Sequence, residues 1–271
     1  MKNQFQWIGQ WFSPVLVCVI VAACTAPENT PTVNTSVSVA PTVAKTSPQS
    51  GTIAQTSPPS AIATLQAEAQ MAGFSGDGKH YIHLESWRDM GAGIPHAAMQ
   101  IVNLPANACV ANGCVRTRFN ESQANLSTKA AENSLLEQTQ ALRQDLKLTP
   151  PIAGTSLPVT ARSRNADGSE TVTLRLANNQ PLQLKLQQKQ AIAKLDGGGE
   201  KEQASMQLEI TYAGKTRTIG SITQMRDWTQ KFSIQDVQQS PDGNHIAVLV
   251  TAAERAFEGT LGRTMVQGFE L

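Results

Sequence analysis

The stretches GFSGDGKHYIHL (residues 73–84) and QSPDGNHIAVL (residues 239–249) decide the fold, because each is a turn pattern that leads directly into a strand pattern. In both, a Ser and an Asp-Gly pair supply a side-chain acceptor and a residue that tolerates positive φ, and an alternating or apolar run of strand length follows. The turn residues are Ser75, Asp77 and Gly78 in the first copy and Ser240, Asp242 and Gly243 in the second. Ser-x-Asp-Gly turns are typical of hairpins in β-propellers, but a propeller needs at least four blades of roughly 40 residues each. We therefore expect propeller-like hairpins at both ends of one domain.

Between these hairpins, one segment has the pattern of a helix. Ala131, Leu135, Leu142 and Leu146 share one face of residues 127–148, Ser127 or Thr128 would cap the start, and a Pro-Pro pair follows the end. The pattern then changes to period two in several strand-length runs, at residues 157–163, 170–176, 182–188, 206–212 and 216–219. The sequence therefore predicts an α+β fold, mostly antiparallel β with one main helix.

A run of three glycines, residues 197–199, interrupts this β-rich part within the charged segment 194–203. It lacks the strand-turn-helix context and the Lys-Ser/Thr ending of a phosphate-binding loop. We interpret it as a flexible loop.

The first 24 residues have the layout of a bacterial secretory signal. Lys2 is the only cation of the n-region, the apolar run 15–23 is too short to span a bilayer, and Val21-Ala22-Ala23-Cys24 resembles a lipobox. In a lipobox the Cys is acylated and becomes the new N-terminus, and each buried methylene of its chains then contributes roughly 0.8 kcal/mol to membrane binding. We expect a lipid (palmitate-type) anchor on Cys24, the alternative being an ordinary signal peptide. Thr25, where an Asp would favour the inner membrane of enteric bacteria, favours the outer membrane.

Residues 25–60 consist mainly of Thr, Ser, Pro, Val and Ala and have only two charged side chains, Glu28 and Lys45. Such a segment lacks the large apolar groups that would offset the entropy of ordering, and its prolines favour extended conformations. It is expected to be a disordered tether that either lifts the domain away from the lipid or is an unconstrained linker. Residues 61–271 then form a single β-rich globular domain.

The four cysteines fit an exported protein. Cys18 leaves with the signal peptide and Cys24 is used for lipidation, which leaves Cys109 and Cys114 around an Asn-Gly pair. Because an exported protein experiences an oxidising environment, a C-x4-C pair of this kind indicates a disulfide that staples a turn. A metal site would need further ligands with suitable spacing, so we expect no metal and no cofactor.

Charge composition argues against one class of partner. The chain has 22 basic and 21 acidic side chains, 40% hydrophobic residues and 16% charged residues. Nucleic-acid-binding domains normally have a basic excess on one face, so we expect no nucleic-acid partner.

Several motifs together resemble a known family of bacterial proteins. Near the start they are Gly73-Phe74-Ser75, Asp77-Gly78, Tyr81, Glu85, Gly91-x-Gly93-x-Pro95-x-Ala97 and the strand 100–103; near the end they are the segment 240–250, Phe257-Glu258-Gly259 and Arg263. These segments are similar to the predicted secreted proteins catalogued as domain of unknown function 2259. The resemblance covers residues 70–270 and departs from the family at His96, where Tyr is usual, and at Met90. It implies export but no established activity.

The histidines and turn serines of the sequence do not form a recognisable catalytic motif. His80 and His83 would point to opposite faces of a strand, and His96 and His245 are expected on the surface. Ser75 and Ser240 lack the context of a nucleophile elbow, so we assign their hydroxyl groups to hydrogen bonds within the turns.

Carboxylates and tryptophans are the remaining candidates for a ligand site. Glu85 and Glu258 would face each other as in a glycosidase if the two hairpins lie side by side, or join Asp77 and Asp242 around Ca²⁺. Asp89 is a third candidate, although acidic residues beside glycine-rich turns more often bond backbone amides. Two tryptophans, Trp87 and Trp228, would stack on a carbohydrate or, in the favoured interpretation, fill the core.

The sequence thus favours a lipid-anchored cell-envelope protein without enzymatic activity. It would be attached to the membrane through acylated Cys24, facing the periplasm or the cell surface, and would bind an envelope protein, a glycan or a small ligand. The alternative localisation is secreted or periplasmic, and the alternative function is an envelope hydrolase with a carboxylate site near Glu85 and Glu258.

Overall fold

The computed structural model describes residues 64–117, 119–257 and 259–271. Contacts divide the chain into residues 1–55 and 56–271, so everything described below belongs to the second unit. The predicted signal peptide, Cys24 and the tether lie outside the described residues.

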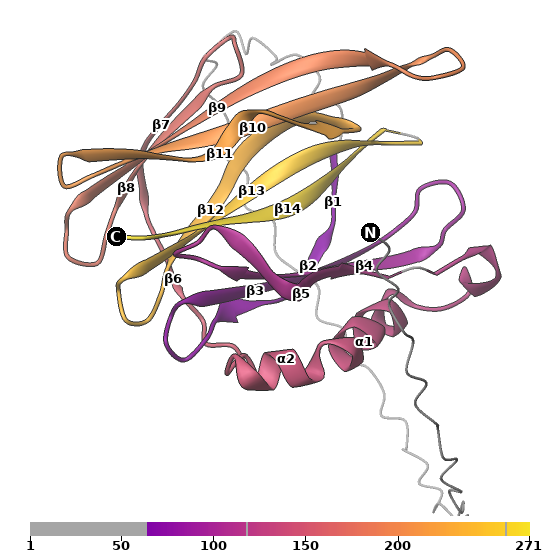
Figure 1. Cartoon of the computed structure of the whole chain (residues 1–271), viewed down its shortest axis with the longest axis horizontal. Helices are drawn as coiled ribbons and strands as arrows, with labels where there is room; N and C mark the ends of the chain where they lie inside the picture. The colour runs from indigo at the N-terminus through magenta and orange to yellow at the C-terminus, as the bar shows by residue number, and fades with distance from the viewer. Residues whose placement is uncertain (1–63, 118, 258) are drawn as a thin grey trace, which may run out of the picture. The chain divides into compact units, whose positions relative to one another are not determined.

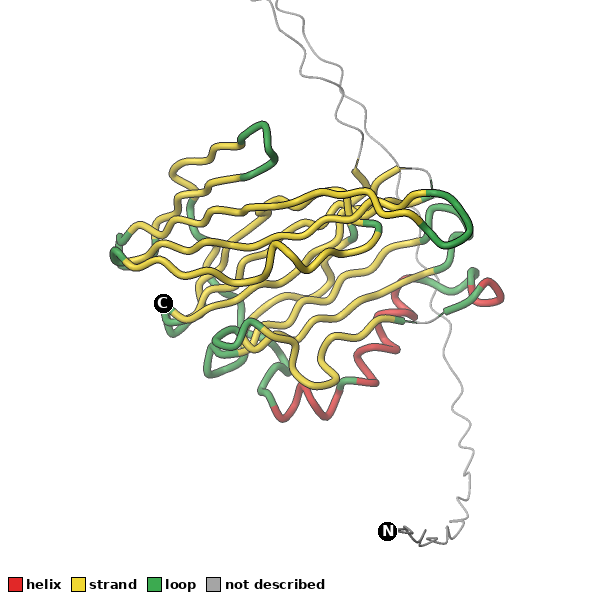
Figure 2. The backbone as a smooth tube through the Cα atoms, turned by 45° about the horizontal axis from the view of Figure 1, so that its top comes forward, coloured by secondary structure: helices red, strands yellow, loops and turns green. Residues whose placement is uncertain are grey.

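The described residues form strands for most of their length, with one helical segment between the first and second groups of strands (Figure 2). The first group comprises β1 (Thr64–Gln66), β2 (Glu68–Phe74), β3 (His80–Arg88), β4 (Pro95–Asn103) and β5 (Ala108–Arg116). A 3-10 turn (Glu121–Gln123) and two helices follow, α1 (Thr128–Gln138) and α2 (Gln140–Asp145). The second group comprises β6 (Thr155–Ser156), β7 (Val159–Arg164), β8 (Glu170–Arg175), β9 (Pro181–Lys194), β10 (Glu200–Tyr212), β11 (Lys215–Asp227), β12 (Thr229–Gln239), β13 (His245–Ala256) and β14 (Gly259–Glu270).

These strands build three sheets, which we call the helix-backed, middle and outer sheets. The helix-backed sheet has the order β2-β3-β4-β5, the middle sheet β1-β14-β13-β12-β6 and the outer sheet β11-β10-β9-β8-β7. All paired strands are antiparallel except β1 and β14, which run parallel. The predicted mostly antiparallel architecture is therefore confirmed, and the described residues do not form a propeller.

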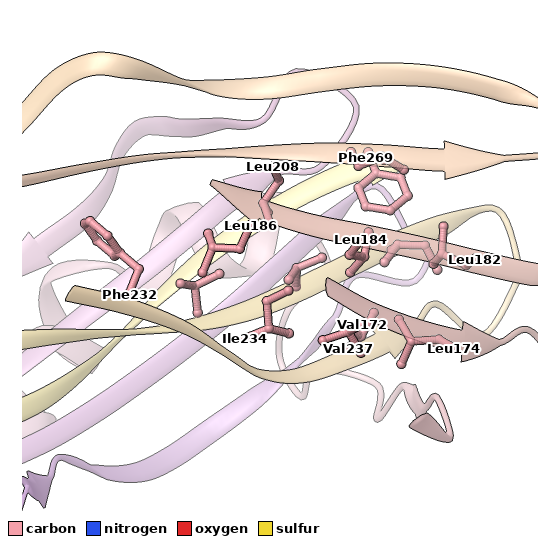
Figure 3. Packing of buried hydrophobic residues seen from close by; sticks show 14 of the residues in the cluster. Val172, Leu174, Leu182, Leu184, Leu186, Leu208, Phe232, Ile234, Val237 and Phe269 are labelled. Carbon is pink, nitrogen blue, oxygen red and sulfur yellow. The ribbon is translucent and has the colours of Figure 1, made fainter. Parts of the chain in front are cut away.

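The sheets and helices pack as layers (Figure 1). The two faces of β13 show why, since alternate residues point to opposite sides of a strand. Ile246, Val248 and Val250 pack against the outer sheet in the largest core cluster, whereas Ala247 and Leu249 pack against the helix-backed sheet. Leucines of the outer sheet fill the first interface together with Phe232 and Phe269 (Figure 3). The helices cover the far face of the helix-backed sheet, so the middle sheet is buried on both faces.

Beyond the short edge strands β1 and β6, side chains of the two neighbouring sheets satisfy the outer backbone groups of β14 and β12 in the middle sheet. At the β14 edge, Thr264 N–H donates to Glu85 (2.9 Å), and Gln100 accepts from Val266 N–H (3.2 Å) and donates to the Thr264 carbonyl (2.6 Å). At the β12 edge, Glu170 accepts from Ile234 N–H (3.0 Å), and the Gln188 amide bonds both the N–H (2.9 Å) and the C=O (3.2 Å) of Phe232. A buried edge without such partners would leave backbone groups unsatisfied. On each side of the middle sheet, one Glu and one Gln therefore satisfy the unpaired backbone groups of the strand.

The single helix expected over residues 127–148 is wrong, because the structure has two short helices. Thr139 separates them with φ −103° and ψ 7°, outside the helical range. Its hydroxyl donates back to the carbonyl of Leu135 (2.7 Å), and such local bonds of Thr compete with the helical ladder. Both helices pack on the helix-backed sheet, so apolar residues recur at helical spacing through both of them. The break at Thr139 is therefore not visible in the spacing of apolar residues.

The strands β9, β10 and β11 are also longer than predicted. The β9–β10 hairpin pairs continuously from Leu182↔Tyr212 to Lys194↔Glu200, so half of the charged segment 194–203 lies in strands. Only residues 195–199, which include the three glycines, form the connecting turn. The hydrogen-bonded ladder extends beyond the apolar core. The strands were predicted too short because backbone pairing outside the core does not require an alternating apolar pattern.

The disulfide between Cys109 and Cys114 is confirmed. Both cysteines lie in β5, where Cys114 pairs with Gln100 and Cys109 with Val102. The four residues between them form a bulge in one strand, with Asn112 at φ 59°. The cystine thus closes a bulge, whereas the sequence suggested a turn between strands.

The two Ser-x-Asp-Gly turns have the same internal hydrogen bonds. In the first, the Ser75 hydroxyl donates to Asp77 (2.6 Å) and accepts from His80 N–H (3.0 Å), and Gly78 has φ +72°. In the second, Ser240 donates to Asp242 and accepts from His245 N–H (2.9 Å), and Gly243 has φ +78°. These hydroxyl groups are turn elements, as their sequence context indicates.

We expect Ser240→Ala to lower the free energy of unfolding by about 2 kcal/mol and Ser75→Ala by about 1 kcal/mol. Each change leaves a backbone N–H without its acceptor, and the N–H of His245 is buried whereas that of His80 is partly buried. Urea denaturation of both variants measures the difference, with Ser163→Ala, an exposed residue of β7, as the matched control. Equal effects in all three variants would contradict this assignment.

Candidate functional site

Glu85 and Trp87, two of the candidates from the sequence, meet at one place between the helix-backed and middle sheets. Both lie on the face of β3 that looks toward β14, because residues two apart share a face. The residue that joins them is Arg263 of β14. Its guanidinium lies 3.2 Å from Glu85 and stacks 4.2 Å above the ring of Trp87. Arg263 is 178 residues from Glu85 in the sequence, and only the packing of the two sheets brings it to Glu85 and Trp87.

The carboxylate of Glu85 is fully occupied by the protein itself. Its side chain is 0% exposed, one oxygen accepts from Arg263 and the other from Thr264 N–H. Burial raises the pKa of Glu85, but the contacts with His83, Arg263 and Thr264 N–H outweigh burial and hold this pKa below its ordinary value. The group therefore stays ionised and serves to join two sheets, a role unlike that of a catalytic acid open to a substrate.

The two remaining candidate carboxylates, Asp89 and Glu258, do not join this site among the described residues. Asp89 caps the β3–β4 turn, where it accepts from the N–H groups of Gly91 (2.7 Å) and Ala92 (2.9 Å). These bonds hold the pKa of Asp89 below its usual range. Glu258 lies outside the described residues, so the facing pair of carboxylates has no described second member.

The two turns do pack against each other, but without a metal site among the described residues. A Cβ on Gly78 would lie 2.6 Å from Oδ1 of Asp242, which places the turns in contact. Both Asp77 and Asp242 already accept bonds from a Ser hydroxyl and a backbone N–H. Within the described part of the chain no group of three or more His, Cys, Asp or Glu side chains could hold a metal ion.

Two expectations from the sequence are corrected here. His245 was expected on the surface, but it is buried, with Nδ1 3.4 Å from Asp242. Trp228 was expected to fill the core, but it is 45% exposed. His96 is partly buried because its ring stacks on that of Trp87, with centroids 5.4 Å apart.

A groove of about 480 Å³ opens beside Arg263. Its walls come from β4 and β5, from β13 and β14, and from the corner between β11 and β12. The two cysteines of the Cys109–Cys114 bulge line the groove from β5, and Arg226 and Trp228 line it from the corner between β11 and β12. A second hollow of about 390 Å³ shares Asn107, Arg226, Met265 and Gln267 with the first, so the two lie next to each other along β14.

Trp228 is held in an unusual backbone conformation at this groove. Its φ is +60°, a left-handed value that is rare for bulky residues. Two backbone hydrogen bonds of 2.7 Å hold it there, one from its N–H to the Glu202 carbonyl and one from Arg255 N–H to its own carbonyl. Strained backbone of this kind is often found at functional sites, so the observation marks this corner as a candidate.

The lining of the groove carries more basic than acidic groups. Three arginines line it, Arg116, Arg226 and Arg263, together with Asp227 and Glu254. Both acids are already paired, Asp227 with Lys201 at 2.6 Å and Glu254 with Arg263 at 3.6 Å. Among the described residues, Arg116 and Arg226 have no ion-pair partner within 4.0 Å.

The sequence drew attention to Arg263 only as part of the family resemblance, and it gave no indication of Arg116 or Arg226. The three arginines come from β5, β11 and β14, and no motif or spacing connects them. Trp228 carried one usable signal, since an aromatic residue between two long polar strand patterns is unusual, but its exposure depends on the corner between β11 and β12.

Comparison with protein families gives one match. The model of a family described as a predicted secreted protein (DUF2259) matches residues 88–269. The match begins after Glu85, so the first Ser-x-Asp-Gly hairpin lies outside it. Neither the curated proteins nor the solved structures contain a match. In the described residues, no helix is both long and apolar enough to cross a membrane.

Proposed function

Because this chain belongs to the DUF2259 family of predicted secreted proteins, we propose that it is a lipid-anchored, non-enzymatic binding module of the bacterial cell envelope. The anchor half of the proposal rests on Val21-Ala22-Ala23-Cys24 at the end of an apolar run and on the Thr/Ser/Pro-rich residues 25–60. Thr25 after the Cys favours the outer membrane, with the domain in the periplasm or at the cell surface.

The groove beside Arg263 is the observation that carries the binding half. Its volume of about 480 Å³ is within the range of roughly 300–1,000 Å³ that is usual for small-molecule sites. Hydrogen-bonded strands and a disulfide form its walls, so it is preorganised, which reduces the entropy lost on binding. A glycan or small ligand fits such a groove better than a flat protein partner does.

The hydrolase alternative receives less support from the same geometry. It depends on Glu85 and Glu258, and Glu85 is buried with both oxygens engaged. A general acid or base must reach the proton that it transfers within about 3 Å or through one water. The ion pair with Arg263 would have to break before Glu85 could do so.

Metabolic labelling with an alkyne fatty acid tests the anchor. We expect the native chain to carry the label and to sediment with membranes, and Cys24→Ala to lose both properties, because the acyl chains supply the membrane affinity. Cys18→Ala is the matched control and should behave as the native chain. An unlabelled native chain would refute the anchor and indicate a freely secreted domain.

A substrate screen tests the absence of enzymatic activity. The exported chain is assayed against glycosides and esters, together with Glu85→Gln, at a temperature at which both are folded. Turnover by the native chain that disappears in Glu85→Gln would refute the binding-only function in favour of the hydrolase.

A further inference from the structure

We propose that the groove beside Arg263 binds an acidic saccharide, with its anionic oxygens between Arg116 and Arg226 and a sugar ring against Trp228. This inference rests on the proposed binding function and specifies the chemical class of its ligand.

The two free arginines supply the first argument. Arg116 of β5 and Arg226 of β11 come from two different sheets and line the same groove, and among the described residues neither has an ion-pair partner. Guanidinium groups present planar forks of N–H donors that match the oxygens of a carboxylate or phosphate. A ligand with one such group would therefore meet donors from both sheets.

Electrostatics of the groove favour an anion. Although Arg116 remains exposed, desolvation and then the positive charge of Arg263 lower its pKa, and together with the smaller effect of Arg226 they outweigh the opposite effect of the Glu254 and Glu85 carboxylates. Arg263 is itself committed to Glu85 and Glu254. The cations thus repel one another across the groove, and an anion between them would relieve that repulsion.

Trp228 supplies the second, independent argument. Its indole is 45% exposed, lines the same groove and is presented by a left-handed backbone that two hydrogen bonds maintain. A flat aromatic face suits the apolar face of a pyranose ring, and a rigid aromatic residue provides contact area at little entropic cost. A simple inorganic anion has no apolar face that could pack against this indole ring.

The size of the groove and the hollow beside it supply the third argument. The main cavity lies next to the second hollow of about 390 Å³, and Arg226 and Asn107 line both. A site for a lone phosphate would be smaller, whereas an elongated groove fits a short chain of sugars. The nearly neutral net charge of the chain, +1, argues against nucleic acid as the anionic polymer.

Isothermal titration of the full exported chain in detergent with trigalacturonate tests the inference, with maltotriose as the neutral control. We expect trigalacturonate to bind and maltotriose to bind at least about tenfold more weakly, because maltotriose has no anionic oxygens to accept charge-assisted hydrogen bonds from the guanidinium groups. Arg116→Ala, Arg226→Ala and Trp228→Ala should each weaken trigalacturonate binding about tenfold or more. Arg175→Ala, an exposed arginine of β8, should leave it within about twofold.

Several outcomes would overturn the inference. They are an absence of trigalacturonate binding at millimolar concentration, equal affinity for maltotriose, and affinity that is unchanged in Arg116→Ala and Arg226→Ala. Inorganic phosphate that binds as tightly as trigalacturonate would show an oxyanion site without a saccharide role. Phosphatidylglycerol vesicles that bind and displace trigalacturonate would show a lipid headgroup site.

Two further measurements separate the possible causes of failure. Thermal unfolding of each variant shows whether it is folded, and Arg116→Lys, which keeps the charge but loses the planar fork, should lose less affinity than Arg116→Ala. Binding of maltotriose alone would overturn the acidic ligand but keep the binding function, and the acylation experiment on Cys24 is independent of all these results.

Discussion

Replacing Glu85 with alanine is expected to lower the free energy of unfolding by about 3–5 kcal/mol, the usual result of removing one partner of a buried ion pair. The change leaves Arg263, which is 4% exposed, with only the more distant Glu254 at 3.6 Å. It also leaves Thr264 N–H at the β14 edge without an acceptor. The helix-backed and middle sheets would lose the contact that joins them at this point.

Urea denaturation followed by circular dichroism measures this effect. Glu202→Ala is the matched control, because Glu202 forms a more exposed ion pair with Arg255 at 3.4 Å, and exposed pairs contribute about 0–1 kcal/mol. A loss in Glu85→Ala no larger than that in Glu202→Ala would contradict the structural role of Glu85.

The same carboxylate makes part of the stability depend on pH. The folded-state pKa of Glu85 lies below its ordinary value of 4.5, so its ionised form is favoured by folding. Its contribution is therefore fully present above the unfolded-state pKa and is lost as the pH falls through the folded-state pKa. The difference in unfolding free energy between the native chain and Glu85→Gln should accordingly shrink below about pH 4.5.

The second large effect is expected from Gln100→Leu, which should lower the free energy of unfolding by about 2–5 kcal/mol. Leucine has a similar size but leaves Val266 N–H and the Thr264 carbonyl without partners, and each buried unsatisfied group costs about 1–3 kcal/mol. Gln188→Leu should have a comparable effect, because Gln188 satisfies both backbone groups of Phe232 on the opposite edge.

Thermal and urea unfolding of the two variants test this edge-closing role. Gln183→Leu is the control, since Gln183 is an exposed residue of β9, and we expect a change within about 0.5 kcal/mol. If Gln100→Leu and Gln188→Leu behave like Gln183→Leu, the edges are satisfied in some other way and the role assigned to both amides is wrong.

The predictability of the fold differed between its elements. The two hairpin turns could be predicted because Ser, Asp and Gly complete the hydrogen bonds of a turn within six residues. The break of the helix at Thr139 could not, since apolar spacing runs on through both helices. The lengths of β9 and β10 were underestimated because their ladder continues beyond the core.

The candidate site was predicted only in part. Glu85 and Trp87 were singled out as an acid and an aromatic residue near a glycine-rich turn, and they do lie together. Their common partner, Arg263, is 178 residues from Glu85 in the chain, and no spacing rule spans that distance. Arg116 and Arg226 were missed for the same reason, and Trp228 was assigned to the core because aromatic residues usually fill it.

The sequence by itself determined the turns, the antiparallel β class, the disulfide and the membership of an exported family. The turns, the strand pattern and the disulfide depend on residues within a few positions of one another, where backbone geometry limits the outcome, whereas the family is identified from motifs at both ends of the domain. Only the tertiary structure decided which sheet lies against which, that Glu85 joins two of them, and that three arginines and Trp228 share a groove. These features arise from side chains on β3, β5, β11 and β14. The packing of the layers brings such distant residues together. The pattern of apolar residues along the sequence specifies which faces of the strands are buried, but it does not specify which element packs against each face.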